Sequence, residues 1–295
     1  MSGAEDALHA HLQTGVTTVA RAWLLERRDG VNFGFTDHDL PLSFDGQTFD
    51  ANGGLTARAL LQTSGLAIDN TEALGALSDA RITEADINAG RYDGAVVTAW
   101  LVNWQDVSAR KILFKGSIGE IRRGDGAFEA ELRGLTEMLN QPQGRVYGHD
   151  CSAILGDAAC GVDVLAPGYS TERPLEVISE RKVFGFAELA GFDAAWFERG
   201  RFVVVSGAAA GLVGLIKHDR ETDAGREIEL WQALRAPLEP GDIVRLEVGC
   251  DKRSETCAAK FLNIANFQGF PHIPGDDWLT AIPRTNGRNT GGALV

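Results

Sequence analysis

Residues 112–134, ILFKGSIGEIRRGDGAFEAELRG, indicate the fold class of this chain. Apolar and polar residues alternate along 112–123 and again along 127–134, the pattern of β-strands that bury one face. Gly-Asp-Gly at 124–126 separates them with residues that suit a tight turn. The stretch therefore predicts a β-hairpin.

Similar patterns extend to both sides of this hairpin. Alternating or apolar segments bounded by turn residues predict further strands, at 19–26, 31–36, 41–51, 96–104, 201–207, 211–220, 226–232 and 242–249. Helical spacing predicts one or two short helices within 71–90, a helical turn within the loop 186–200, and a short helix over 257–267 that begins at Cys257. We expect a mainly β protein with short helices, in which sandwich- or barrel-like domains precede a C-terminal cysteine region.

A Pro- and Gly-containing passage, APGYSTERP at 166–174, indicates a domain boundary near residue 170. We therefore expect a β-rich domain over 1–170 and a second β-rich domain over 171–295. The tail 284–295 has little to bury, and we expect it to be mobile unless a partner orders it.

Composition narrows the functional classes. The 295 residues carry 41 acidic and 28 basic side chains, a formal charge of −13, which disfavours direct binding to a phosphate backbone. No apolar run approaches the roughly 20 residues that cross a bilayer, so we expect no membrane insertion. The acidic N-terminus lacks the apolar core of a signal peptide, which predicts synthesis in the cytoplasm, where disulfides are rare.

The four cysteines form two local pairs. Eight residues separate Cys151 from Cys160, and six separate Cys250 from Cys257. If the two loops face each other, four thiolates converge, and such a site suits either Zn²⁺ or an iron–sulfur cluster. The spacings exceed the two to four residues usual for zinc pairs, which favours the larger [4Fe–4S] cluster. Free buried thiols and disulfides are the remaining alternatives.

A shared centre would also be a cross-link. Joining residue 151 to residue 257 closes a loop of about a hundred residues, for which chain entropy gives on the order of 4 to 5 kcal/mol of stabilisation. We therefore expect a structural centre that ties the two halves of the chain together. Lys252 and Arg253 are candidates for offsetting its negative charge, although both also suit a solvated turn.

Three histidine-containing motifs are weaker candidates. His149 lies two residues before Cys151 and is an alternative ligand, as imidazole is in some clusters. Asp37-His38-Asp39 contains residue types that can bind a metal ion. In an extended strand, however, His38 points to the face opposite Asp37 and Asp39, so we interpret the motif as a structural turn or an interface. His272 is expected to fix a loop.

The C-terminal pattern resembles a known family. Residues 249–279, GCDKRSETCAAKFLNIANFQGFPHIPGDDWL, are similar to a phage signature in which GC-D-K-x-x-x-T-C leads into F-x-N-x-x-N-F-x-G-x-P-x-x-P-G. The matching positions are Gly249, Cys250, Asp251, Lys252, Thr256, Cys257, Phe261, Asn263, Asn266, Phe267, Gly269, Pro271, Pro274 and Gly275. Residues 33–54 also look like the opening domain of that family, so the similarity covers nearly the whole chain.

The family resembled is that of the baseplate hub proteins of siphophage-like tails and gene transfer agents, the conserved BR0599-like tail proteins, which are similar to the tail-tip protein of lambda-like phages. The resemblance implies a non-enzymatic, β-rich virion structural protein, assembled as a homotrimer into the tail baseplate. Its implied partners are the distal tail protein ring and the central, megatron-like fibre or receptor-binding protein. It further implies a [4Fe–4S] cluster held by Cys151, Cys160, Cys250 and Cys257.

Two other functions stay open at this point. One is an iron–sulfur electron-transfer protein or enzyme, although the sequence carries no nucleophile elbow and no phosphate-binding glycine loop. The other is a zinc-stabilised binding module. Purified protein distinguishes them, because a brown chain with about four irons indicates the cluster and a colourless chain with one zinc indicates the zinc module.

Overall fold

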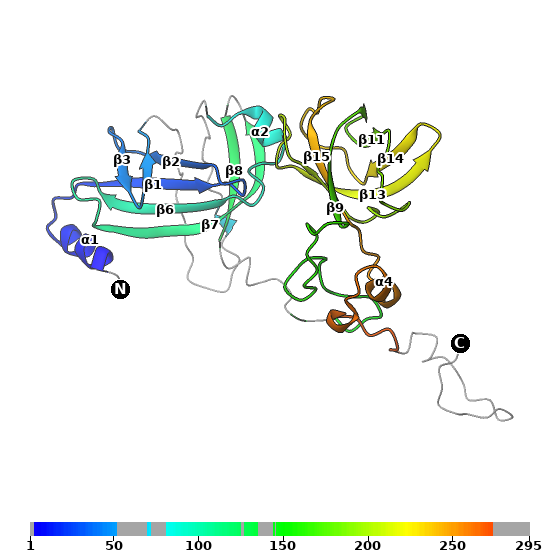
Figure 1. Ribbon diagram of the computed structural model, residues 1–295. Coiled ribbons are helices and arrows are strands. Elements are labelled where there is room, and N and C mark those ends of the chain that lie inside the picture. The colour runs from blue at the N-terminus through cyan, green and yellow to red at the C-terminus, as the bar shows by residue number, and fades with distance from the viewer. Residues whose placement is uncertain are drawn as a thin grey trace. The chain divides into compact units, whose positions relative to one another are not determined.

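The computed structural model describes residues 3–51, 70–71, 81–124, 127–134, 144 and 146–273 (Figure 1). The chain divides into two compact units, unit 1 (Met1–Pro142) and unit 2 (Gln143–Val295). This division falls before the predicted boundary at residue 170, because residues 146–169 make backbone hydrogen bonds with residues near the C-terminus. All four cysteines consequently belong to unit 2.

Unit 1 is built on a six-stranded antiparallel sheet with the order β2-β1-β6-β7-β8-β5. Its strands are β1 (Val19–Glu26), β2 (Asn32–Thr36), β5 (Asn70–Thr71), β6 (Val96–Asn103), β7 (Arg110–Gly124) and β8 (Ala127–Gly134). The hairpin predicted from residues 112–134 is confirmed as β7 and β8, with Gly124 opposite Ala127. Register shifts in β7 opposite both neighbours mark irregularities that let the sheet curl.

Both faces of the unit 1 sheet are buried. A small hairpin, β3 (Leu42–Phe44) and β4 (Gln47–Phe49), turns at Asp45-Gly46 and places Phe44 and Phe49 against Ala22 and Leu24 of β1. Trp23 and Leu25 alternate with these residues and face the opposite core, as strand periodicity requires.

The described part of unit 1 contains two helices. Helix α1 (Gly3–Gln13), which the sequence reasoning did not predict, contacts β6 and β7 and buries Leu8. Helix α2 (Glu84–Asn88) confirms a short helix within 71–90, and its N-cap residue Thr83 accepts a hydrogen bond from the backbone of Asp86. The other part of that prediction, 72–80, lies outside the described residues. No described helix is long and apolar enough to span a bilayer.

Unit 2 contains a seven-stranded antiparallel sheet, the unit 2 sheet, with the order β10-β11-β14-β13-β12-β15-β9. Its strands are β9 (Ser170–Pro174), β10 (Val177–Ser179), β11 (Val183–Phe186), β12 (Arg201–Val204), β13 (Val213–Thr222), β14 (Gly225–Leu230) and β15 (Ile243–Glu247). The core is tightly packed, with the rings of Phe184 and Phe202 stacked 4.4 Å apart. The mainly β fold with short helices is therefore confirmed.

The edge pair β9–β15 explains how distant cysteines meet. Ser170 at the start of β9 lies opposite Glu247 at the end of β15, because the strands are antiparallel. The chain before Ser170 and the chain after Glu247 therefore leave the sheet at the same end, and the Val248 N–H donates to the Tyr169 carbonyl at 2.7 Å. We call these two segments, 146–169 and 249–273, the cysteine region.

The cysteine region contains little regular structure. Helix α4 (Ser254–Ala259) and the 3₁₀ helix η1 (Ile264–Asn266) follow β15, and Figure 1 draws α4 beside the loops that precede β9. We predicted one helix over 257–267 beginning at Cys257. The helix instead begins at Ser254 and ends before Leu262, whose φ of +50° interrupts helical geometry.

Candidate metal centre

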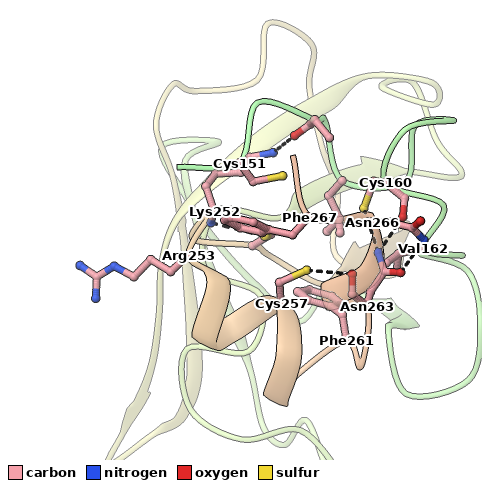
Figure 2. A pocket seen from close by; sticks show the side chains of 13 residues that line it. Cys151, Cys160, Val162, Lys252, Arg253, Cys257, Phe261, Asn263, Asn266 and Phe267 are labelled. Atoms are coloured by element: carbon pink, nitrogen blue, oxygen red, sulfur yellow. Dashed lines mark hydrogen bonds between the residues drawn. The ribbon is translucent and has the colours of Figure 1, made fainter. Parts of the chain in front are cut away.

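The four cysteines line a single cavity in unit 2. Its empty volume is about 330 Å³, part of it open to solvent. Cys151 and Cys160 reach it from the segment before β9, Cys250 from the loop after β15, and Cys257 from α4. Figure 2 shows the Cys151, Cys160 and Cys257 sulfur atoms around this space. The predicted convergence of both pairs is therefore present in the structure.

Hydrogen bonds between the two segments hold the cavity together. The Cys151 N–H donates to the Lys252 carbonyl at 2.9 Å, and the Lys252 ammonium donates to the Ala153 carbonyl. At the other side, the Asn263 side-chain amide donates to the Cys160 carbonyl at 2.6 Å. Figure 2 marks these contacts, which join ligand candidates about a hundred residues apart.

Three of the sulfur atoms have nitrogen donors nearby. The Lys252 N–H lies 3.4 Å from Cys250 Sγ, the Gln268 N–H lies 3.4 Å from Cys151 Sγ, and Asn263 Nδ2 lies 3.9 Å from Cys160 Sγ. Such donors stabilise thiolate and are characteristic of the surroundings of metal-bound cysteine.

Cys257 differs from the other three cysteines. Its sulfur atom lies 3.4 Å from the Asn263 carbonyl oxygen, a distance at which a thiol proton would be donated to that oxygen. Binding of a metal requires that proton to leave.

Asp157 shapes the loop between Cys151 and Cys160. Its carboxylate accepts the N–H groups of Cys160 at 2.7 Å, Ile154 at 2.8 Å and Ala159 at 3.0 Å. These bonds, the one from Cys160 first, hold the pKa of Asp157 below its usual value. The carboxylate thus fixes the backbone on which Cys160 is presented.

Asp251 plays the corresponding part in the second loop. Its carboxylate accepts the Thr256 hydroxyl at 2.8 Å and the Arg253 N–H at 3.0 Å. Burial would raise the pKa of Asp251, but these hydrogen bonds outweigh it and the pKa is lowered. The bonds close the short turn that sets Cys250 opposite Cys257.

Backbone geometry explains two positions of the family pattern. A Cβ atom on Gly249 would stand 1.7 Å from the Glu198 carbonyl oxygen, so only glycine fits before Cys250. Lys252 adopts a φ of +70°, which turns its N–H toward the Cys250 sulfur.

The effects of the cysteines on one another's pKa reflect their proximity. Burial raises the pKa of Cys257, and negative charge at Cys151, Cys250 and Cys160 raises it further. Burial likewise raises the pKa of Cys250, against the opposing effect of Lys252. Without a bound cation these thiols stay protonated at neutral pH, so metal binding must release protons.

The other candidate ligands lie elsewhere. His149 Nδ1 donates a hydrogen bond to the Pro271 carbonyl at 3.2 Å, and neither His149 nor His272 lines the cavity. Asp37 and His38 form a turn after β2, where Asp37 accepts the Arg21 N–H at 2.6 Å and His38 Nδ1 faces the Leu40 N–H at 3.0 Å. These contacts agree with the turn interpretation.

The described residues contain no set of three or more His, Cys, Asp or Glu side chains arranged to hold one metal ion. The cysteines surround a space instead. Sequence reasoning did not identify Asp157 and Lys260 as part of this region. The available signals were an aspartate three residues before Cys160 and a lysine three residues after Cys257.

Comparison with known proteins supports the resemblance seen in the sequence. Residues 5–163 match the family described as "Baseplate hub protein, N-terminal attachment domain", and residues 195–277 match "Phage conserved hypothetical protein BR0599". A solved chain titled "Virion of native gene transfer agent (GTA) particle" is 56% identical, with a TM-score of 0.88, and the match covers 98% of this chain and 99% of that one. The comparison with curated proteins gave no match.

The two family matches divide the cysteines between them. The first match includes Cys151 and Cys160, and the second includes Cys250 and Cys257, so the cavity is built from both. The first match alone spans more than half of the chain. The chain therefore belongs to the family of baseplate hub proteins of phages and gene transfer agents.

Proposed function

We propose that this chain is a structural hub of a virion-like particle and that a [4Fe–4S] cluster on Cys151, Cys160, Cys250 and Cys257 stabilises its second unit. The observation that carries this proposal is the convergence of both cysteine pairs on one cavity. The role is structural rather than catalytic. Unit 1 connects the hub to the distal tail protein ring, and the assembled homotrimer contacts the central fibre protein.

The cavity between the sulfur atoms supports a cluster over a single zinc ion. Four thiolates on one zinc, with Zn–S bonds of about 2.3 Å, lie roughly 3.8 Å from one another. A cube of four irons and four sulfides instead fills space between its thiolates, each of which approaches from its own direction. The four cysteines reach the cavity from the segment before β9, the loop after β15 and α4, which suits the second arrangement better.

The surroundings also fit a negatively charged sulfur-rich group. Lys252 and Arg253 line the cavity, and backbone N–H groups point at Cys151 and Cys250. When bound, the cluster would supply four strong bonds between the segment before β9 and the segment after β15. The residues of this chain hold the cysteines in place and exclude solvent from one side.

The location of the site defines its mechanical role. All four cysteines lie in unit 2, so a cluster would not tie unit 1 to unit 2, as the sequence led us to expect. It would close the chain from residue 151 to residue 257, which contains the whole unit 2 sheet. That closure stabilises the end of the sheet from which the cysteine region leaves.

Attachment is assigned to unit 1 by family description. The match named for N-terminal attachment begins at residue 5 and covers the described sheet of unit 1. An assembly assay distinguishes attachment by unit 1 from the role of the cysteines. The test compares particles assembled with wild-type chain, with Cys250→Ser, and with Ser254→Ala as the control in the same loop.

We expect Cys250→Ser to retain binding to the isolated distal tail protein while the yield of complete tails falls at least tenfold. Ser254→Ala should give the wild-type yield. A normal yield of complete tails with Cys250→Ser would reject the cysteine site as a requirement for the hub. Loss of binding to the distal tail protein would reject the assignment of attachment to unit 1.

A further inference from the structure

A half-buried lysine lies beside the residues that line the cysteine cavity without being one of them. Lys260 is the C-cap of α4, three residues after Cys257. Its ammonium donates to the Trp196 carbonyl at 2.8 Å and to the Gly249 carbonyl at 3.0 Å. The same ammonium lies 4.3 Å from the centre of the Trp196 ring, a cation–π distance.

The backbone groups of Lys260 make two further hydrogen bonds. Its N–H donates to the Thr256 carbonyl at 2.9 Å within α4, and its carbonyl accepts the Tyr169 hydroxyl at 3.3 Å. Tyr169 ends the segment that carries Cys151 and Cys160, and Gly249 immediately precedes Cys250. Lys260 therefore contacts the backbone next to two of the four cysteines, Cys250 and Cys257, and the side chain that ends the segment carrying the other two.

The loop that receives the ammonium is itself fixed by the unit 2 sheet. Buried Asp219 on β13 pairs with Arg226 on β14 at 2.5 Å and accepts the Phe197 N–H at 2.9 Å. Arg226 also donates to the carbonyls of Phe192 and Asp193 in the same loop. These bonds fix the position of the Trp196 carbonyl. Because the Lys260 ammonium bonds both this carbonyl and the Gly249 carbonyl, it fixes the backbone next to Cys250 and Cys257 relative to the unit 2 sheet.

Within the described part of the chain, Lys260 forms no direct ion pair. Its two hydrogen-bond partners are carbonyl oxygens, and the negative groups that act on it from a distance are Cys250, Asp251 and Asp219. Burial lowers the pKa of Lys260, which is the usual effect of desolvating a cation. A half-buried cation with carbonyl partners favours negative charge nearby, and Cys250 is the titratable group that acts on it most strongly.

We propose that Lys260 is a positioning residue and an internal counter-cation of the cysteine site, which fixes the Cys250–Cys257 pair and stabilises its thiolates. This inference rests on the proposed function, since it concerns the same metal site. Arg253, by comparison, is exposed, so salt screens its charge more strongly.

The test uses the full-length chain with Lys260→Met, Lys260→Arg and Lys217→Met. Methionine keeps the length of the side chain and removes the charge, whereas arginine keeps the charge. Lys217→Met is the matched control, because it removes the same charge from a partly exposed ion pair with Glu229 on the unit 2 sheet. Thermal unfolding and far-UV circular dichroism confirm that each variant is folded.

Two measurements follow. Competition with a chelator gives the affinity for Zn²⁺, a probe that needs only the four thiolates, and we expect Lys260→Met to bind at least about tenfold more weakly. After reconstitution with iron and sulfide, redox titration gives the midpoint potential of the cluster. We expect this potential to be lower in Lys260→Met, because loss of a nearby positive charge disfavours the added electron, and near the wild-type value in Lys260→Arg and Lys217→Met.

The outcomes separate the two proposals. If wild-type chain binds neither zinc nor an iron–sulfur cluster, the proposed function fails, and with it the role of Lys260. If wild-type chain is loaded and Lys260→Met matches it in zinc affinity and potential, the metal site stands and the role of Lys260 is rejected. If the affinity falls while the potential is unchanged, the counter-cation part is rejected.

Discussion

The unit 2 sheet and the cysteine region are connected through β9 and β15, but different interactions stabilise them. Six large apolar side chains of the sheet and of the loop before β12 are completely buried, namely Phe184, Phe197, Phe202, Ile216, Ile228 and Leu230. Among the described residues of the cysteine region, the buried apolar side chains are Ala153, Cys257 and Phe261, whereas Val146, Tyr147, Ile154, Leu165, Leu262 and Ile264 are exposed. The hydrophobic effect accounts for the first region, and the second needs another source of stability.

The hydrogen bonds differ in the same way. Backbone ladders connect every neighbouring pair of strands in the unit 2 sheet. The cysteine region relies on side-chain groups such as Asp157, Asp251, Asn263 and Lys260, which fix individual turns. Such contacts specify a shape but contribute little net free energy each. The comparison suggests that a centre bound by four cysteines supplies the stability that the core of this region lacks.

The largest expected effect comes from removing a ligand. Cys250→Ser should abolish stoichiometric binding of metal and open residues 146–169 and 249–273, while the unit 2 sheet keeps its fold because its core is unaffected. Hydrogen exchange measured by mass spectrometry reports both regions in one experiment. Unchanged protection of the cysteine region against hydrogen exchange in this variant would show that its stability does not depend on the four cysteines.

A core substitution should destabilise the unit 2 sheet rather than the cysteine region. Phe202→Ala leaves a cavity beside Phe184 and should lower the free energy of unfolding of the unit 2 sheet by about 3 to 5 kcal/mol. Val213→Ala is the control on the same sheet, because Val213 is exposed and should change stability by less than about 0.5 kcal/mol. Denaturant unfolding of metal-free chain measures both. Equal effects of the two substitutions would show that the core does not hold the sheet.

The junction between the two regions is tested at Gly249. A methyl group there would stand 1.7 Å from the Glu198 carbonyl oxygen, so Gly249→Ala must displace backbone and should cost about 1 to 3 kcal/mol. Gly148→Ala is the control, since no atom lies within 4 Å of its added methyl group. Thermal unfolding and metal affinity should change together in Gly249→Ala alone. A neutral Gly249→Ala variant would show that the loop before Cys250 has room to move.

The smallest expected effect depends on pH. The lowered pKa of Asp157 means that its carboxylate stabilises the folded loop above its unfolded pKa of about 3.9, and this contribution disappears as the pH falls through the folded pKa. Asp157→Asn should therefore reduce the stability of the metal-free cysteine region at pH 7 and have almost no effect near pH 2.

Hydrogen exchange near Cys160 at several pH values checks this prediction. A difference between wild type and Asp157→Asn that stays constant down to pH 2 would exclude the carboxylate as its cause. Asp163→Asn, in the same segment, provides a comparison in which the Leu165 N–H is the backbone group bonded.

Most of the fold could be predicted from the sequence because its strands carry strong local patterns. Asp45-Gly46 and Gly124 mark turns that the structure confirms, and the alternation along β13 and β14 matches their burial. The strands β9, β10 and β11 were missed, because STERP and VIS have little alternation and stand next to prolines and glycines. Helix α1 was missed because one buried residue, Leu8, leaves a weak apolar stripe.

The same omission explains why the expected domain boundary differs from the division between unit 1 and unit 2. The ligand candidates were identified from their types and spacings, but their placement depends on β9 pairing with β15, a contact between distant residues. Without β9, the boundary was set near residue 170 and the cysteines appeared to join two domains. The position of Lys260, three residues after Cys257, was only a weak signal, because its carbonyl partners on Trp196 and Gly249 are defined by the folded backbone and not by side-chain type.

Metal analysis of the full-length chain, purified without oxygen, tests the central claim most directly. We predict about four irons and four sulfides per chain, visible absorbance from the cluster, and loss of both when Cys250 or Cys160 is replaced by serine. A wild-type chain that carries one zinc, or four free thiols and no metal after reconstitution with iron and sulfide, would contradict a [4Fe–4S] cluster as the source of stability in the cysteine region.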